Sequence, residues 1–442
     1  MYDTIVIGTG TAGLTAAGIL AQKGKKVAVV DNRPYGGTCA LRGCQPKKYL
    51  VNNTQIAAET RALLGKGYKT PAVTDWTQLQ QFKGEFTSKV TENTKKSLKD
   101  NGIDSYEGTA TFRDSKSLLI KESGEVLSAN SFLIATGASA VQLKMKGSVL
   151  PHGSDDFLEL KEIPKSIVFI GGGYISLEFA FVAALAGSQV TVLQKGDSFL
   201  NMFPQTLLSP VIKSAEEHGI KMVTGVDVVG IKKTNDGYRV NTVKHGDFDG
   251  AYVIAGIGRA PEIKNLNLDA VGVKYDRRGI ITDEYMQSTA ESIYAAGDCV
   301  SSIMLAPVAD MEAITAATNI ISEKSKQVDY DSVPSVVFTY PQIASVGLTE
   351  EKAEALGHKV TVKKGSGSGM MNYRRLNAKH IYYETVTDSE SGKLLGAHIV
   401  SPYAGELINL FALAIKHGLP ASALKDLPWA YPTYTSDIKY MV

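Results

Sequence analysis

Apolar and polar positions near the start of the chain follow the pattern of a strand, a turn, a helix and a second strand. In residues 4–31, TIVIGTGTAGLTAAGILAQKGKKVAVVD, a short apolar run leads into closely spaced glycines. A helical segment follows, and a second apolar run ends at an aspartate. Buried strands that alternate with helices are typical of parallel α/β sheets. The pattern therefore predicts a βαβ unit at the N-terminus.

The glycines of this unit have the spacing of a dinucleotide-binding turn. Gly8 permits the tight turn, Gly10 lets a pyrophosphate approach the backbone, and Gly13 brings the helix close to the strand. The helix N-terminus adds free N–H groups and a dipole that favours phosphate. Asp31 ends the second strand, where its carboxylate can bind a ribose diol.

The same pattern recurs 163 positions after residue 4, in residues 167–194, IVFIGGGYISLEFAFVAALAGSQVTVLQ. Two positions differ: Ser176 replaces the third glycine, and Gln194, followed by Lys195, replaces the terminal acid. A carboxylate there would repel a 2′-phosphate, so its absence beside a cation favours NADPH, with NADH as the alternative. The chain is thus expected to carry two dinucleotide sites that differ in the residues facing the ribose: Asp31 in the first, and Gln194 with Lys195 in the second.

A helical segment near the C-terminus is apolar on most of its faces, LINLFALAI at residues 407–415. A helix that faces water on one side needs only one apolar stripe. We therefore expect this helix to pack against a second copy of the chain, the alternative being burial within its own domain.

Length and charge exclude several classes of partner. A chain of 442 residues suggests roughly three domains, and its net charge of +2 gives no electrostatic footprint for nucleic acid or a membrane surface. The N-terminus has no signal-peptide pattern, and no apolar run is long enough to cross a bilayer. We expect a cytoplasmic protein that binds neither nucleic acid nor membrane.

Two of the three cysteines, Cys39 and Cys44, lie in one segment, GGTCALRGCQPKK at residues 36–48. In a reducing compartment a close cysteine pair is a metal site or a redox couple. No histidine lies near the pair, which argues against zinc, so we expect no metal. Pro46 fits the first turn of a helix with Cys44 at its N-terminus, where the dipole favours a thiolate. Two dinucleotide units beside a dithiol suggest electron relay from one nucleotide, through a second, to sulfur.

With these motifs the chain resembles the flavin-dependent pyridine nucleotide-disulfide oxidoreductases, the group that contains glutathione reductase, dihydrolipoamide dehydrogenase and mercuric reductase. The resemblance covers essentially the whole length. It also rests on FLIATGA (132–138), AGIGRAPEIKNLNLDAVGV (255–273), IYAAGDC (293–299), MLAPVA (304–309) and VPSVVFTYPQIASVGLTEEKA (333–353). In the last of these, Tyr340 stands where the family usually has histidine.

The resemblance implies an α/β fold with two Rossmann-like dinucleotide-binding domains and a C-terminal α+β dimerisation domain. Its expected parts are an FAD-binding domain (1–147), an NAD(P)-binding domain (148–260), a central segment that completes the FAD domain (261–328) and an interface domain (329–442). It further implies a homodimer whose active site is shared between subunits.

The resemblance also implies roles for individual residues. Cys39 would attack the substrate disulfide while Cys44 contacts the flavin, and Lys47 and Glu178 would form an ion pair beside it. Tyr174 would cover the flavin face until nicotinamide displaces it. The cofactor-binding residues would be Gly8, Gly10, Ala12, Gly13, Asp31, Gly37, Thr38, Lys47, Ala110, Thr136, Gly137, Gly171, Gly173, Tyr174, Ile175, Gln194, Lys195, Gly258, Arg259, Asp298 and Ala306.

The C-terminal segment, WAYPTYTSDIKYMV, departs from the family pattern. Relatives that reduce or form small disulfides carry His-Pro-Thr and then a glutamate. Here Tyr431 takes the histidine position, Ser436 takes the glutamate position, and Asp437 lies one residue late. A tyrosine with an ordinary pKa of ~10 is a poor proton acceptor at neutral pH. We expect Tyr431 to point at the cysteine pair of the neighbouring subunit. His417 ends the preceding helix, and we expect it to be an ordinary surface or capping residue.

The expected function is electron transfer from NADPH through FAD to a redox-active Cys39–Cys44 disulfide, and on to an unidentified small-molecule or protein disulfide. The alternative is NAD(P)H-dependent reduction of metal ions, as in mercuric reductase, or of quinones. Cys39→Ser separates the two classes, because a quinone reductase that works directly from flavin would survive it.

Overall fold

The computed structural model describes residues 1–147 and 150–442, which divide into two compact units. The first unit comprises residues 1–48, 81–141 and 258–330, and the second comprises residues 49–80, 142–257 and 331–442. Each unit is therefore assembled from three separate stretches of the chain. The expected division into four consecutive segments stays a prediction, and residue 148, where its second segment begins, lies outside the described residues.

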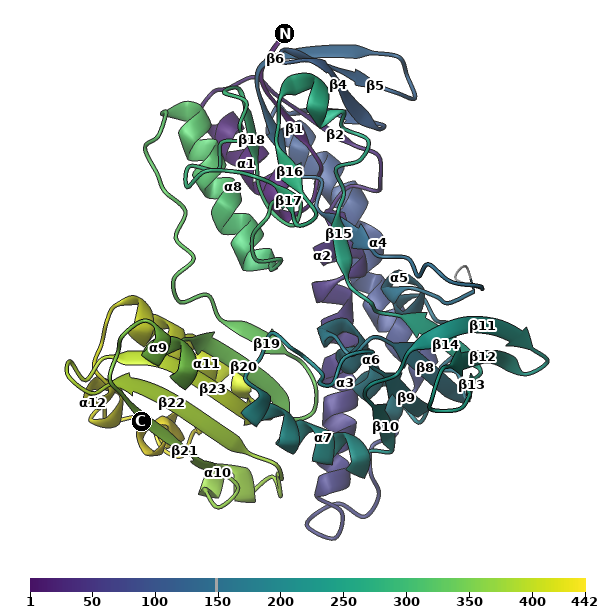
Figure 1. The fold of residues 1–442 in the computed structure, drawn as a ribbon, viewed down its shortest axis with the longest axis vertical. Helices are drawn as coiled ribbons and strands as arrows, with labels where there is room; N and C mark the ends of the chain where they lie inside the picture. The colour runs from purple at the N-terminus through teal and green to yellow at the C-terminus, as the bar shows by residue number, and fades with distance from the viewer. Residues whose placement is uncertain (148–149) are drawn as a thin grey trace. The chain divides into compact units, whose positions relative to one another are not determined.

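A seven-stranded sheet forms the centre of the first unit, in the order β3-β2-β1-β6-β5-β4 with β18 paired to β6 (Figure 1). Strands β1, β2, β3, β6 and β18 run parallel, whereas β4 and β5 are antiparallel to their neighbours. The inner strands are almost wholly buried because both faces of the parallel part are covered. The strands are β1 (Tyr2–Ile7), β2 (Val27–Asp31), β3 (Asp104–Glu107), β4 (Ala110–Asp114), β5 (Ser117–Ile120), β6 (Val126–Ile134) and β18 (Ile293–Ala295).

Two helices of the first unit, α1 (Thr11–Gln22) and α8 (Ala306–Ile321), pack closely against each other. Their buried faces are made mostly of alanine, so the two backbones can approach closely. The hydroxyl of Thr15 also donates to Asp310 Oδ1 at 2.6 Å, which fixes the two helices in register. The start of α1, where a dinucleotide would bind, is thereby held against α8.

The second unit repeats the βαβ pattern in a four-stranded parallel sheet, β10-β9-β8-β14. Gly8 and Gly171 both have positive φ, 110° and 103°, and Gly10 and Gly173 are the N-caps of α1 and α6. The repeat predicted from the sequence is therefore confirmed. Its elements are β8 (Ser166–Ile170), α6 (Tyr174–Leu185), β9 (Gln189–Leu193), α7 (Leu208–Glu217), β10 (Ile220–Val223) and β14 (Tyr252–Ala255).

A five-stranded antiparallel sheet, β19-β20-β23-β22-β21, occupies the C-terminal part of the second unit. Leu407, Ile408 and Phe411 of α11 (Ala404–Lys416) are buried and share a core with this sheet, whereas Leu413 is 55% exposed. The apolar helix thus has one face on its own sheet and one leucine directed to solvent. The strands are β19 (Ser335–Val337), β20 (Gln342–Gly347), β21 (Val360–Ser366), β22 (Tyr382–Asp388) and β23 (Leu394–Ser401).

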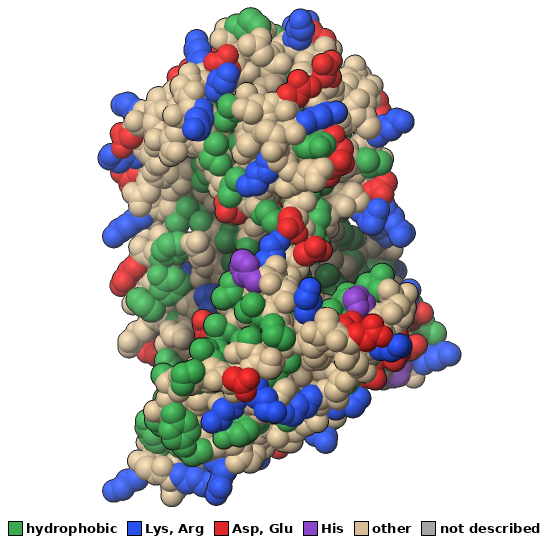
Figure 2. Space-filling model, turned by 90° about the vertical axis from the view of Figure 1, so that its left-hand side faces the viewer, with side chains coloured by type: hydrophobic (Ala, Val, Ile, Leu, Met, Phe, Trp, Pro, Cys, Tyr) green, Lys and Arg blue, Asp and Glu red, His purple; other side chains and the backbone are tan. Residues whose placement is uncertain are grey.

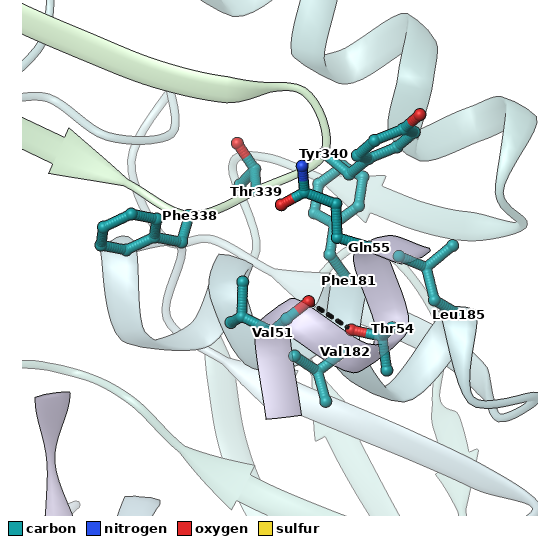
Figure 3. A pocket seen from close by; sticks show the side chains of 9 residues that line it. All are labelled: Val51, Thr54, Gln55, Phe181, Val182, Leu185, Phe338, Thr339 and Tyr340. Atoms are coloured by element: carbon teal, nitrogen blue, oxygen red, sulfur yellow. Dashed lines mark hydrogen bonds between the residues drawn. The ribbon is translucent and has the colours of Figure 1, made fainter. Parts of the chain in front are cut away.

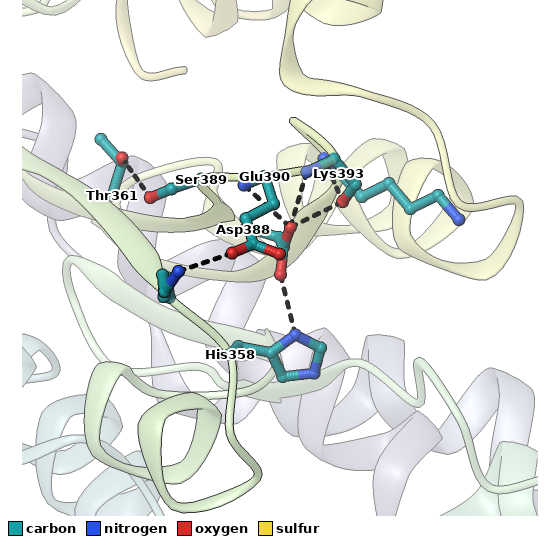
Figure 4. A network of polar contacts seen from close by, with 8 residues as sticks. His358, Thr361, Asp388, Ser389, Glu390 and Lys393 are labelled. Atoms are coloured by element: carbon teal, nitrogen blue, oxygen red, sulfur yellow. Dashed lines mark hydrogen bonds and ion pairs between the residues drawn. The ribbon is translucent and has the colours of Figure 1, made fainter.

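The turn between β22 and β23 is organised by Asp388 (Figure 4). Its carboxylate accepts hydrogen bonds from the backbone N–H groups of Glu390 and Ser391 and, at 2.8 Å, from His358 Nδ1. These bonds hold the pKa of Asp388 below its usual range. The carboxylate therefore ties the turn to the loop that leads into β21.

The remaining elements connect these sheets. Helix α3 (Cys44–Ala62) begins in the first unit and continues in the second. Helix α4 (Trp76–Asp100) begins in the second unit and continues in the first. The others are α2 (Gly37–Arg42), α5 (Ser154–Leu158), α9 (Glu350–Ala355), α10 (Met371–Arg374), α12 (Ala421–Lys425), β7 (Ala138–Ala140), β11 (Val228–Thr234), β12 (Gly237–Thr242), β13 (Phe248–Gly250), β15 (Arg259–Pro261), β16 (Tyr275–Asp276), β17 (Gly279–Ile280) and three 3₁₀ helices, Gln205–Leu207, Leu268–Val271 and Tyr434–Tyr440.

Acidic and basic side chains are interspersed over the face shown in Figure 2. None of the helices in the described parts of the chain is both long and apolar enough to span a membrane.

Candidate active site

The first glycine turn joins β1 to α1 in a conformation that leaves little room for side chains. A Cβ at Gly8 would lie 2.3 Å from the carbonyl oxygen of Ala135, and one at Gly13 would lie 1.9 Å from the carbonyl oxygen of Gly8. Gly10 caps α1 without a side-chain hydrogen bond, and the first helical turn holds no acidic residue. The first N–H groups of α1 are thus available for a phosphate, so the turn fits a dinucleotide.

Asp31 lies at the end of β2 beside this turn. Its Oδ2 accepts hydrogen bonds from the backbone N–H and hydroxyl of Thr9, at 2.6 and 2.7 Å, and its Oδ1 accepts from Arg33 N at 2.9 Å. These bonds orient the carboxylate next to the glycines. Its contact with a ribose diol stays a prediction.

The segment with the two cysteines packs directly on the glycine turn. Gly37, with φ of 69°, approaches so closely that a Cβ there would lie 2.3 Å from Gly10 Cα. Cys39 follows on α2, and Cys44 is the first residue of α3, as the sequence predicted. The predicted redox pair and the predicted FAD turn are therefore neighbours within the first unit.

The thiols of Cys39 and Cys44 are hydrogen-bonded to each other. This bond, together with burial, raises the pKa of Cys39. The hydroxyl of Thr11 and the backbone N–H of Cys44 also bond to the Cys39 sulfur, and they act in the opposite direction. Thr11 was not predicted from the sequence, although it stands within the glycine motif as the first residue of α1.

Asp298 lies on a loop that wedges between α1 and α8. A Cβ at the preceding residue, Gly297, would meet the Cβ atoms of Ala12 and Ala309, each at 3.3 Å. Partial burial raises the pKa of Asp298, and the charge of Arg259 opposes this shift. Ala12 and Asp298 are therefore brought to the same end of the first unit.

Glu312 of α8 is a second residue that the sequence did not predict. Its buried carboxylate accepts the Gly297 N–H and the Tyr330 hydroxyl, each at 2.7 Å. Burial raises its pKa. Through its bond to Gly297, Glu312 holds the loop that carries Asp298. No local sequence motif predicts this role, because the partners of Glu312 are distant in sequence.

The other predicted residues of the first unit take varied positions. Ala110 is buried in β4, and Arg259 donates to the carbonyl oxygen of Ala138. Cys299 is fully buried, which confirms the prediction that it is a small core residue. The remaining predicted residues of this unit are each at least partly accessible to solvent, and their contacts with a cofactor stay predictions. They are Thr38, Lys47, Thr136, Gly137, Gly258 and Ala306.

The second glycine turn, in the second unit, is built in the same way. A Cβ at Gly171 would lie 2.4 Å from the carbonyl oxygen of Gly256, and Gly173 caps α6 without a side-chain bond. Tyr174, at the start of α6, is 41% exposed, and Ile175 is half-buried. The turn thus leaves the N-terminus of α6 available for a second dinucleotide.

Ser176, which replaces the third glycine, is accommodated by a glycine elsewhere. A Cβ at Gly256 would lie 2.1 Å from Ser176 Oγ, so only glycine leaves room for the serine. Gly256 is a supporting residue that the sequence did not single out.

Gln194 and Lys195 follow β9. Gln194 Oε1 accepts from Gly172 N at 2.8 Å, and its Nε2 donates to the carbonyl oxygen of Ser198 at 3.0 Å. Lys195 Nζ forms an ion pair with Asp227 Oδ1 at 2.9 Å. The side chain of Gln194 therefore stabilises the turn after β9, and Lys195 is paired with Asp227.

Glu178 is buried on α6 and accepts a hydrogen bond from the backbone N–H of Phe338 at 2.9 Å. Lys47, its expected partner, belongs to the first unit, so the ion pair stays a prediction.

Tyr340, where the family usually has histidine, lies beside a small cavity of ≈ 10 Å³ lined by α3 and α6 (Figure 3). Burial raises its pKa, and its carbonyl oxygen accepts from Ser214 Oγ at 2.6 Å. These contacts are those of a packing residue.

In the C-terminal segment, Tyr431 differs in solvent exposure from the residues that follow it. Tyr431 is 70% exposed, whereas Ser436 and Asp437 are buried. Ser436 caps the last 3₁₀ helix with Thr433, and Asp437 accepts from Asn372 Nδ2 at 3.1 Å, while burial raises its pKa. His417 is the C-cap of α11, as predicted.

Comparisons with known proteins agree with this arrangement. Residues 2–313 match the sequence model of the pyridine nucleotide-disulphide oxidoreductases, and residues 333–442 match that of their dimerisation domain. The chain is 34% identical to a dihydrolipoyl dehydrogenase of Haloferax volcanii, over 98% of this chain and 93% of the relative. It is 31% identical to a mercuric reductase of Staphylococcus aureus, over 99% and 81% respectively.

Solved structures give the same fold. The HOCl-induced flavoprotein disulfide reductase RclA of Escherichia coli superposes with a TM-score of 0.90 at 26% identity, covering 100% of this chain and 99% of that one. A Cu(II) complex of the same reductase gives a TM-score of 0.91. In the parts of this chain that are described, no three His, Cys, Asp or Glu residues are grouped so as to hold a metal ion.

Proposed function

Because the chain belongs to the pyridine nucleotide-disulphide oxidoreductase family, we propose that it passes electrons from NADPH through FAD to a Cys39–Cys44 disulfide, and on to a small-molecule or protein disulfide. The observation that carries this proposal is the contact between the cysteine segment and the first glycine turn. Gly37 lies against Gly10, and Thr11 bonds to the Cys39 sulfur. Sulfur is thus held beside the N-terminus of the helix that fits the dinucleotide.

When bound, FAD supplies two-electron chemistry, taking a hydride equivalent from NADPH and delivering both electrons to sulfur. Cleavage of the Cys39–Cys44 bond leaves a thiolate at Cys44, which the N-terminus of α3 stabilises. Cys39, as the thiolate, attacks one acceptor sulfur and forms a mixed disulfide, and the other acceptor sulfur leaves and takes up a proton. Cys44 then attacks the Cys39 sulfur and releases the second acceptor thiol. One disulfide, NADPH and a proton become two thiols and NADP⁺.

The match to the dimerisation domain supports a homodimer. We infer that Tyr431 lies beside the cysteine pair of the other subunit, because its side chain is 70% exposed on its own subunit. Its hydroxyl can donate a hydrogen bond to the acceptor. Asp437 lies one residue after the family's glutamate position and bonds to Asn372, so we do not expect it to support Tyr431 as a base. Thiol interchange with simple disulfides is therefore expected to be slow.

A second candidate function is reduction of a metal ion. It is favoured by the tyrosine at position 431, since a metal acceptor needs no base for a leaving thiol, and by the similarity to a mercuric reductase. In this case the reduced Cys39 and Cys44 would receive the ion. Quinone reduction directly from flavin is the variant of this function that would not need Cys39.

Anaerobic reduction by NADPH, followed by reoxidation with a panel of acceptors, tests these alternatives. The panel consists of glutathione disulfide, lipoamide, a protein disulfide, Hg(II) and a benzoquinone. We expect a disulfide to reoxidise the wild-type enzyme and Cys39→Ser to abolish that reaction, while Cys299→Ser serves as the matched control. Reoxidation by quinone alone, unchanged in Cys39→Ser, would contradict the proposed function.

A further inference from the structure

One ion pair, between Lys195 and Asp227, lies where the ribose end of the nicotinamide coenzyme is expected. Lys195 Nζ is 2.9 Å from Asp227 Oδ1, and the two side chains are 84% and 57% exposed. Lys195 is the cation that favours a 2′-phosphate, and Asp227 offsets its charge. The pair as a whole is electrically neutral.

Backbone hydrogen bonds hold the two residues side by side. The N–H of Gln194 donates to the carbonyl oxygen of Val223 at 2.8 Å, and the N–H of Val226 donates to the carbonyl oxygen of Gln194 at 3.0 Å. The turn after β9 is thus joined to the segment between β10 and β11, which carries Asp227 (Figure 1).

The same turn is tied to the second glycine motif through the side chain of Gln194, which bonds to Gly172 N. These hydrogen bonds therefore hold the backbone of Lys195 and Asp227 in a defined position relative to the predicted phosphate site. Their side chains remain free to reorient because both are exposed, and an exposed pair is held only weakly.

We propose that Asp227 sets the coenzyme specificity of this enzyme by limiting the attraction of Lys195 for the 2′-phosphate of NADPH. The inference rests on the proposed function, since it assumes that the second glycine turn binds the coenzyme. A 2′-phosphate is strongly anionic near pH 7, so any position next to Lys195 also exposes it to the repulsion of Asp227. NADH carries no such charge and is affected little.

The test replaces the charge of Asp227 at constant size, in Asp227→Asn. With unit charges several ångströms apart in water-like surroundings, we expect the ratio of kcat/KM for NADPH to that for NADH to rise about three- to tenfold. The change should appear in KM for NADPH and leave kcat unaltered. Asp227→Glu should restore the wild-type ratio, and Lys195→Ala in the Asp227→Asn background should remove the gain.

Asp249→Asn is the matched control. Asp249 pairs with Arg239 at 2.7 Å on the β12–β13 hairpin of the same unit, and both are exposed, so it removes the same charge from a different ion pair. We expect the ratio of this variant to stay within about twofold of the wild type, as is usual for an isolated surface pair.

A binding readout separates affinity from turnover. Calorimetric titration with adenosine 2′,5′-bisphosphate should show tighter binding in Asp227→Asn, and titration with 5′-AMP should not. The difference should shrink at 1 M salt, where the Debye length is ~3 Å.

An unchanged or lowered ratio in Asp227→Asn, with flavin still reduced by NADPH, would overturn the inference and leave the proposed function standing. Failure of both coenzymes to reduce the wild-type flavin would instead refute the proposed function, and the inference with it.

Discussion

Cys39 and Cys44 have unequal surroundings within the pair that they form. Cys39 is half-buried and bonded to both Cys44 and Thr11, and its pKa is raised mainly by the bond to Cys44. Cys44 is exposed and stands at the N-terminus of α3. Negative charge is therefore better accommodated at Cys44 than at Cys39.

Thr11 should make Cys39 more reactive. Its hydroxyl opposes the rise of the Cys39 pKa, so Thr11→Val should raise that pKa further and slow alkylation of the reduced enzyme at pH 7. With one hydrogen bond worth ~1 kcal/mol, we expect roughly a fivefold slower reaction of Cys39 with iodoacetamide, followed by mass spectrometry. Thr15→Val, whose hydroxyl bonds to Asp310 on the same helix, is the control and should leave the rate unchanged. Equal rates of Cys39 alkylation in Thr11→Val and Thr15→Val would show that Thr11 does not affect the reactivity of Cys39.

Tyr431 should limit reduction of simple disulfides. General acid–base assistance is typically worth ~10²–10⁴-fold. Asp437 is buried and bonded to Asn372, so we expect Tyr431→His to recover only part of this assistance, about tenfold or more, with glutathione disulfide. Stopped-flow kinetics should show the gain in reoxidation, with no change in flavin reduction by NADPH. Tyr440→His, at another exposed C-terminal tyrosine, should show no gain. If Tyr431→His is no faster, the tyrosine is not what slows the exchange.

Residues that carry local motifs were predictable from the sequence, and residues that act through tertiary contacts were not. The spacing of Gly8, Gly10 and Gly13 identifies a dinucleotide-binding turn. Gly8 and Gly13 leave no room for a side chain, and Gly10 begins the helix. Gly256 is required only because Ser176 packs on it from another element. Glu312 and Asp227 likewise acquire their roles from partners distant in sequence.

At the scale of elements, the strands β20 and β23 enclose a histidine that should make the antiparallel sheet sensitive to pH. His398 is fully buried, and Nε2 donates to the carbonyl oxygen of Leu348 while Nδ1 accepts from Ser345. Burial lowers its pKa, so the folded state holds the neutral form. Its contribution to stability is present above the unfolded pKa near ~6.5, and is lost as the pH falls through the lower folded value.

His398→Gln should reduce this pH dependence. Between pH 7.5 and 5.0, the melting temperature of the FAD-loaded wild type should fall by about 2–4 °C more than that of the variant, since each ~1 kcal/mol shifts Tm by that amount in a domain of this size. His417→Gln, at the exposed end of α11, should behave as the wild type. Parallel curves for wild type and His398→Gln would show that His398 does not titrate in this range.

The elements themselves show which patterns the sequence could and could not resolve. The βαβ repeat was recoverable because a buried parallel strand and its glycine turn impose a continuous pattern. The helix at 407–415 was ambiguous, because residues such as Phe411 face its own sheet while Leu413 faces solvent, and composition alone does not separate the two faces.

At the scale of the whole molecule, we expect a homodimer that uses the exposed face of α11. Leu413→Lys should therefore weaken the dimer, measured by sedimentation, because a charge would be buried without a partner. The monomer should keep FAD and be reduced by NADPH, but lose turnover with disulfides, since Tyr431 would be missing from the shared site. Leu356→Lys, at a similarly exposed leucine at the end of α9, should stay dimeric. A Leu413→Lys monomer with full disulfide turnover would exclude a shared site.

The central claim is that electrons from NADPH reach Cys39 and Cys44, and counting thiols tests it most directly. The FAD-loaded enzyme is incubated anaerobically with or without NADPH, denatured in an alkylating reagent and digested for mass spectrometry. We predict that Cys39 and Cys44 are joined in the oxidised enzyme and that both become alkylated after NADPH, while Cys299 is alkylated in both samples. The same labelling of Cys39 and Cys44 before and after NADPH, with the flavin fully reduced, would contradict the account.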